Sequence, residues 1–162
     1  MAEVRFTELG FAFVIFDIKP RYSNIMGSFP HKIDTGAICT TISSAQLVDL
    51  GFDENWIKSG RRLEGNERPR VASGNLLDDC YTVVIPEVRI GEFVGYNWPF
   101  MTSLSVPFKF LLGTDTMRFF NWSFDYEHGV CQFDLIHGKR KLLFNSQEQS
   151  IHSIDEVEDG VR

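Results

Sequence analysis

Hydrophobic and polar positions along this chain follow short extended runs rather than the spacing of a helix. Apolar and aromatic residues gather in stretches that Gly, Pro, Asn and Asp separate, which is typical of strands joined by turns. The predicted strands cover residues 11–16, 25–29, 80–85, 88–91, 99–101, 108–112, 122–126 and 130–135. The pattern therefore predicts an all-β fold.

Two short helices are expected within this β pattern. The first covers residues 43–51, with Ser43 or Ser44 as its N-cap and Gly51 as its C-terminal stop. The second covers residues 114–120.

The segment 53–70 has no clear period and is expected to be irregular. It carries four arginines among acidic residues, namely Arg61, Arg62, Arg68 and Arg70 with Glu64 and Glu67. We favour a solvated hairpin of mixed charge. The alternative is that these arginines flank a substrate cleft and select charge.

Length and composition indicate one globular domain over residues 1–144, followed by a polar acidic tail, 145–162, that is expected to be disordered. Fifteen Phe in 162 residues predict a core built on aromatic packing. The net charge of -6 and the pI of about 5.2 argue against a nucleic-acid partner. No apolar run approaches the ~20 residues of a membrane span.

The cysteines and histidines indicate neither disulfides nor a metal site. Cys39, Cys80 and Cys131 are odd in number and lack paired spacing, so we expect free thiols and a cytoplasmic location. The N-terminal segment does not resemble a signal peptide. Metal-ligand spacings such as CxxC do not occur, and the four histidines are scattered and expected at the surface. No metal and no cofactor are predicted.

The tetrad Asp34-Thr35-Gly36-Ala37 carries the candidate chemistry, because it places a carboxylate on a tight turn between two apolar segments. Two carboxylates held about 3 Å apart cannot both ionise, so they share one proton. The ionised group can then take a proton from water while the protonated group polarises a peptide carbonyl. The chain contains one such turn, and Asp115-Thr116-Met117 is its nearest approach to a second. An active site of this kind therefore requires a homodimer.

A second motif lies well downstream, at Leu111-Leu112-Gly113-Thr114-Asp115-Thr116-Met117, followed by Phe120 and Phe124-Asp125. Together the two motifs resemble those of the retropepsin-like aspartic peptidases, in particular their non-viral branch. The resemblance covers roughly residues 10 to 135. It implies a retropepsin-like acid-protease barrel that closes its active site as a homodimer.

The resemblance also implies roles for individual residues. Asp34 would be catalytic, and Thr35 and Gly36 would support the dyad. Substrate would contact the residues that line the cleft and its flap, which are Ala37, Leu111, Leu112, Gly113, Ala72, Ser73 and Gly74. Gly65-Asn66 is the competing flap tip, and a plain surface hairpin is the alternative for either segment.

Several positions depart from the viral pattern or leave alternatives open. Ile38-Cys39 and Thr114 stand where viral members usually carry an ion pair. Lys32 would share a strand face with Asp34, but the turn can redirect it, and we favour an outward-facing side chain. Cys39 is expected to be a small buried hydrophobe. Asp115 is expected to be a charge at a helix N-terminus rather than a catalytic group.

The sequence thus favours an aspartic endopeptidase that cleaves an extended peptide or protein substrate, with apolar residues expected beside the scissile bond. The first alternative is a dimeric module on the same fold that binds peptides or directs assembly without cleaving. The second is a monomeric β-barrel with a chance Asp-Thr-Gly. Residues 142–144 and 11–16 are the two candidates for an interface strand.

Overall fold

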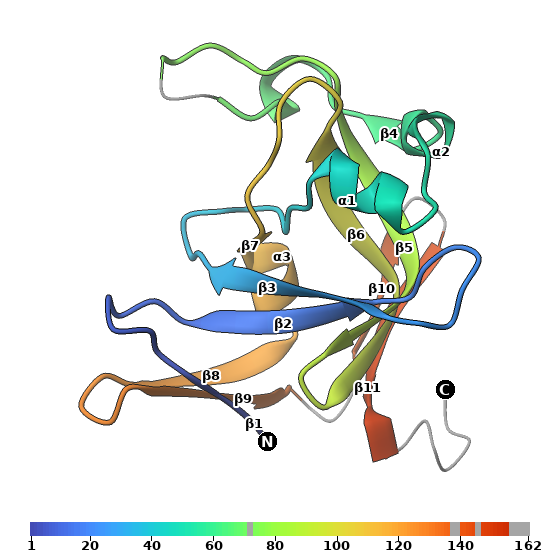
Figure 1. The fold of residues 1–162 in the computed structure, drawn as a ribbon. Helices are drawn as coiled ribbons and strands as arrows, with labels where there is room; N and C mark the ends of the chain where they lie inside the picture. Colours follow the sequence, from blue (N-terminus) through green and yellow to red (C-terminus); the bar gives the residue numbers. More distant parts are fainter. Residues whose placement is uncertain (71–72, 137–139, 145–146, 156–162) are drawn as a thin grey trace.

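The computed structural model describes residues 1–70, 73–136, 140–144 and 147–155, and its fold is built almost entirely from strands (Figure 1). The strands are β1 (Ala2–Arg5), β2 (Phe13–Ile18), β3 (Gly27–Ile33), β4 (Arg61–Arg62), β5 (Cys80–Ile90), β6 (Phe93–Ser103), β7 (Leu111–Leu112), β8 (Phe120–Asp125), β9 (Val130–Leu135), β10 (Arg140–Phe144) and β11 (Gln147–Ser153). The helices are α1 (Ser44–Asp49), α2 (Glu54–Lys58), the 3₁₀ turn η1 (Gly65–Glu67) and α3 (Thr114–Met117). The predicted all-β class with short helices is confirmed.

The strands form two sheets. One has three strands in the order β1-β9-β8, and the other has eight, in the order β10-β11-β6-β5-β2-β3-β7 with β4 added to β5. Within these sheets, β3 and β7 are the parallel pair, with Lys32 opposite Leu111 and Ile33 opposite Leu112. This register brings the chain that leaves β3 beside the chain that leaves β7. Figure 1 shows β3, β7 and α3 close together in the middle of the molecule.

The core is aromatic, as the composition predicts. Phe16 and Phe100 pack edge to face with ring centroids 5.7 Å apart, and Trp98 packs on Phe119 at 4.9 Å. All four side chains are fully buried. Such ring pairs stabilise a fold by about 0.5–1.5 kcal/mol each beyond the area that they bury.

The helices confirm one prediction and correct another. Helix α1 begins after Ser43 and ends before Gly51, whose φ of 88° terminates the helix. Helix α2, in contrast, lies in the segment predicted to be irregular. The Asp53 carboxylate accepts a hydrogen bond from the Trp56 N–H at 2.8 Å and caps this helix, while Trp56 packs on Phe52. Within the described residues, no helix is long and apolar enough to cross a membrane.

Two further corrections concern strands. The predicted strands 80–85 and 88–91 form one strand, β5. Pro86 does not interrupt it, because it lies between the part of β5 that pairs with β4 and the part that pairs with β2. No backbone hydrogen bond from Pro86 is required there. Strand β1 was not predicted, and it pairs with β9.

The predicted disordered tail is wrong for residues 147–153, because they form β11. This strand pairs with β10 on one side and with β6 on the other, where Ile151 lies opposite Gly95 and His152 opposite Val94. Ile151 and His152 are buried although the segment is mostly polar. Backbone pairing on both edges therefore outweighs a composition that is typical of disorder. Residues 156–162 lie outside the described part of the chain.

Candidate active site

The Asp34 turn, residues Asp34–Ala37, follows directly after β3. The Asp34 N–H donates to the Leu112 carbonyl at 3.0 Å, and the Ala37 N–H donates to the Asp34 carbonyl at 3.1 Å. The Gly36 N–H donates to Asp34 Oδ1 at 2.9 Å, so this oxygen is fixed by the turn itself. Asp34 Oδ2 has no hydrogen-bond partner in the described part of the chain, and the side chain is half-buried. The turn thus presents one free carboxylate oxygen at the surface.

The chain between β7 and α3 crosses the Asp34 turn at close range. The Thr114 N–H donates to the Ala37 carbonyl at 2.9 Å, and the Asp115 N–H donates to the Ile38 carbonyl at 3.1 Å. A Cβ atom at Gly113 would lie only 2.6 Å from the carbonyl carbon of Cys39. Glycine is therefore required here for lack of space, since its φ of -92° is open to any residue.

A buried polar network fastens the loop after the turn to α3. The Asp115 carboxylate accepts hydrogen bonds from the Thr40 N–H at 2.9 Å and from the Thr40 hydroxyl at 2.7 Å. The Thr116 hydroxyl lies 2.8 Å from that of Thr40 and accepts the Trp98 indole N–H at 3.0 Å. Burial raises the pKa of Asp115, while the bonds from Thr40 and Thr116 act in the opposite direction.

The sequence predicts only that Asp115 places a charge at the N-terminus of a helix. In the structure, Asp115 also joins that helix to Thr40 in the loop after the Asp34 turn. Its partner Thr40 lies 75 residues earlier, and no local pattern marks that pairing. The only sequence signal is the position of Asp115 two residues after Gly113. Asp115 therefore positions the segment that follows Asp34.

Two hollows meet at Asp34. The lysine hollow, about 670 Å³, is bordered by Asp34 and by residues of β2, β3 and the segment 108–111, among them Lys32 and Lys109. The tyrosine hollow, about 320 Å³, is bordered by Asp34, Thr35, Phe124 and Tyr126. Asp34 thus borders both hollows. Two lysines border the first, and the aromatic rings of Phe124 and Tyr126 border the second.

Lys32 does not face outward, contrary to our expectation. It borders both hollows together with Asp34, and its ammonium lies 3.9 Å from the centre of the Phe11 ring. The alternation of side chains along β3 therefore continues through Ile33, and Lys32 and Asp34 lie on the same face of the strand. Cys39 is half-buried and free, and burial raises the pKa of its thiol.

The remaining predicted site residues divide into three groups. Leu111 borders the lysine hollow, whereas Leu112 and Gly113 are buried beneath the turn and support it. Ser73 and Gly74 are exposed on the connection between β4 and β5. Ala72 lies outside the described residues.

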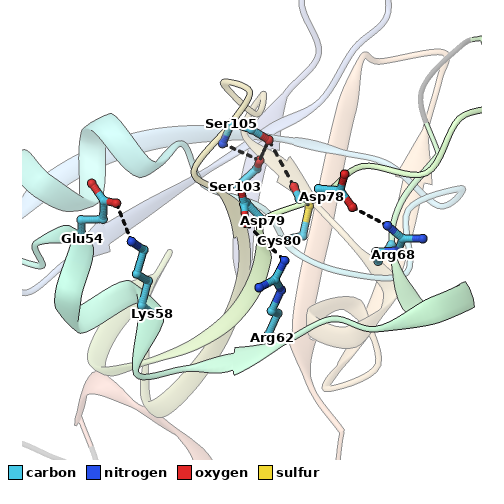
Figure 2. A network of polar contacts seen from close by, with 9 residues as sticks. All are labelled: Glu54, Lys58, Arg62, Arg68, Asp78, Asp79, Cys80, Ser103 and Ser105. Carbon is cyan, nitrogen blue, oxygen red and sulfur yellow. Dashed lines mark hydrogen bonds and ion pairs between the residues drawn. The ribbon is translucent and has the colours of Figure 1, made fainter.

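The segment 61–79, which comprises β4 and its connection to β5 and which we call the polar hairpin, contains several ion pairs between its own residues. Its arms are joined by a bridge between Arg70 and Leu76, so Ser73 and Gly74 lie near its turn, and the competing tip, Gly65-Asn66, lies in η1. Figure 2 shows the pairs Arg68–Asp78 and Arg62–Asp79 at its base.

A third arginine of the polar hairpin, Arg61, pairs with Glu67 at 2.8 Å. Three of the four arginines thus bind acids of the same hairpin. This pairing supports a solvated hairpin of mixed charge over arginines that select a substrate.

Comparison with known proteins gives one informative result. No family model matches the chain, and no curated protein is significantly similar in sequence. Among solved structures, the chain is similar to a retropepsin-like aspartic protease from Rickettsia conorii, with a TM-score of 0.54 and 18% identity over 80% of this chain and 86% of that chain.

The fold is retropepsin-like. This confirms the fold that the two motifs indicate. In this retropepsin-like fold, the Asp34 turn and the Gly113 crossing occupy the centre, where β3 and β7 run parallel.

His31 lies in β3, three residues before Asp34, and was wrongly expected at the surface. Its side chain is 0% exposed and packs against Phe16, with ring centroids 4.5 Å apart. Nε2 lies 2.9 Å from the Thr41 carbonyl oxygen, and Nδ1 lies 3.0 Å from that of Phe29. Burial lowers the pKa of His31 to about 4, although both carbonyls act to raise it.

This buried imidazole makes folding stability depend on pH. Between pH 6.5 and about 4 the unfolded chain binds a proton at His31 and the folded chain does not, so stability falls as pH falls through this window. The expected loss of unfolding free energy is about 3 kcal/mol. Urea titrations from pH 7 to 4 will measure it.

The matched variants for this pH dependence are His31→Asn and His128→Asn. The first should flatten the slope, because its amide takes the place of Nδ1 and can donate to the Phe29 carbonyl without titrating. The second replaces a histidine in an exposed turn and should leave the slope in place. An unchanged slope in His31→Asn would assign the pH dependence to other groups.

Proposed function

We propose that this chain is an aspartic endopeptidase that acts as a homodimer, with one Asp34 from each copy. The observation that carries the proposal is the Asp34 turn itself. One carboxylate oxygen accepts the Gly36 N–H, the other is free at the surface, and the turn is built into the parallel β3–β7 pair. A single such turn supplies half of a carboxylate pair.

In the proposed mechanism the two carboxylates share one proton. The ionised group takes a proton from water, which attacks the peptide carbonyl, and the protonated group donates to the carbonyl oxygen. Thr35 is exposed on the turn, and its hydroxyl has no partner within the described residues, which leaves it available to the second copy. Substrate would lie extended across the two turns, with the polar hairpin as the flap above it.

The surface around Asp34 is the proposed dimer face. Strand β8 forms an outer edge of the three-stranded sheet. Phe124 near its end and Tyr126 just after it border the tyrosine hollow beside Asp34. Tyr126 is 77% exposed and Ile38 79%, so both side chains are available for contact with a second copy.

Of the two predicted interface strands, residues 11–16 pair with β3 from Phe13 onward, and within this segment it is Phe16 that also pairs with β5. This segment therefore remains one candidate. Residues 142–144 lie in β10 at the end of the larger sheet, and their outer edge remains a second candidate.

We further propose that the protein acts in the cytoplasm, without a cofactor. Cys39, Cys80 and Cys131 are all free, as expected in a reducing compartment. The net charge of -6 supports a peptide or protein substrate over a nucleic acid.

The test is cleavage of a diverse peptide mixture at pH 4 to 7, with cut sites identified by mass spectrometry and Asp34→Asn as the control. We expect cleavage by the parent whose specific activity rises with protein concentration, as a site shared between copies requires. A protein that is dimeric and yet cleaves nothing would instead be a peptide-binding module. A protein that elutes as one 18.6 kDa chain at all concentrations would contradict the dimer.

A further inference from the structure

The lysine hollow combines apolar walls with two cations. Phe13, Phe108 and Leu111 supply much of the apolar surface. Lys32 in β3 and Lys109, two residues before β7, also border the hollow. The acidic side chain at its border is that of Asp34. A pocket of this composition suits a ligand that has a hydrocarbon portion and a negative charge.

The two lysines differ from the arginines of the polar hairpin in having no acidic partner. No ion pair joins Lys32 or Lys109 to an acid within the described part of the chain, whereas Arg61, Arg62 and Arg68 each pair with one. Lys109 is exposed, and Lys32 is half-buried, with its ammonium on the Phe11 ring, which borders the tyrosine hollow. This contact holds the charge near the site without neutralising it.

We propose that Lys32 and Lys109 make the site select a peptide with an acidic side chain next to the scissile bond. The proposal rests on the proposed function, since it is Asp34 that locates the bond to be cut. Because Asp34 borders the same hollow, the side chain that fills it belongs to a residue beside that bond. Glutamate fits best, since its methylenes can lie on the apolar walls while its carboxylate meets the two ammonium groups. This proposal adds an acidic residue to the apolar residues expected beside the scissile bond.

The test compares peptides that differ only by Glu against Gln at one position beside the cut site found in the mixture. We expect kcat/KM to favour Glu by about tenfold at pH 6, since two partly exposed ion pairs would form. The preference should shrink as the pH falls below about 4.3, because the substrate carboxyl then becomes protonated. Equal rates for the two peptides at pH 6 would overturn the proposal while leaving the peptidase activity established.

Lysine variants distinguish a contact between Lys32 and the substrate carboxylate from an effect of Lys32 on Asp34. Lys32→Met and Lys109→Met should each reduce the Glu preference to about threefold, and the double variant should remove it. Lys58→Met is the matched control, because Lys58 pairs with Glu54 in α2, away from the hollow, and the preference should not change. If Lys32→Met slows both peptides equally, Lys32 acts through Asp34 and not on substrate. If no peptide is cleaved by any form, the proposed function itself fails.

Discussion

Asp34→Asn is expected to lower kcat/KM for peptide cleavage by at least about 10³-fold, because both groups that move protons are lost from the dimer at once. The Asn Oδ1 can still accept the Gly36 N–H, so the turn should survive. The free energy of unfolding should change by no more than about 0.5 kcal/mol. Peptide kinetics and urea denaturation on the same preparation measure the two effects.

Mixing the Asp34→Asn variant with the parent protein tests whether two copies share one active site. When Asp34→Asn is added to an equal amount of parent protein, subunits exchange, and activity should fall to about half of that of the parent alone. A tenfold excess should lower activity to about one-eleventh. If each chain carried a complete site, added variant would leave the activity unchanged. Heterodimers that form and stay fully active would therefore contradict the one-carboxylate-per-copy mechanism.

Gly113→Ala is expected to destabilise the protein by about 3–5 kcal/mol, through a backbone collision rather than strained φ. The new methyl would lie 2.6 Å from the Cys39 carbonyl carbon, 2.7 Å from its oxygen and 3.0 Å from the Ala37 oxygen. These atoms cannot move apart without weakening the bonds from Thr114 and Asp115 to the same loop. Activity should fall together with stability, because the Asp34 turn begins that loop.

Gly129→Ala provides the control for Gly113→Ala. Gly129 has a φ of 66° but no atom within 4 Å of its missing Cβ, so only the backbone conformation is penalised. The expected cost is about 1 kcal/mol. Chemical denaturation of both variants tests the difference. Equal losses would show that the close approach at Gly113 relaxes at little cost.

The sequence predicted the central site because both parts of it are short motifs. Asp34-Thr35-Gly36 and Leu111-Leu112-Gly113 each specify a local conformation, and the parallel pairing of β3 with β7 joins them. The chemical roles of these residues stay predictions until cleavage is measured.

Other features could not be predicted because tertiary contacts decide them. The segment 147–153 is polar and becomes a strand only because β6 offers it an edge. His31 is buried by aromatic rings that come from other strands. The orientation of Lys32 depends on whether the strand period extends to Asp34, and its partner Phe11 is not identifiable from the sequence.

The hydrogen bond from Asp34 to Leu112 has a consequence for the protein during its synthesis. Almost half of the chain's length separates the two residues, so the turn leaves the ribosome long before the strand that holds it. Contacts of such separation form late in folding. A nascent chain therefore carries the Asp34 carboxylate without the frame that orients it. We expect partly made chains to be unable to cut themselves or their neighbours, without any need for an inhibitory segment.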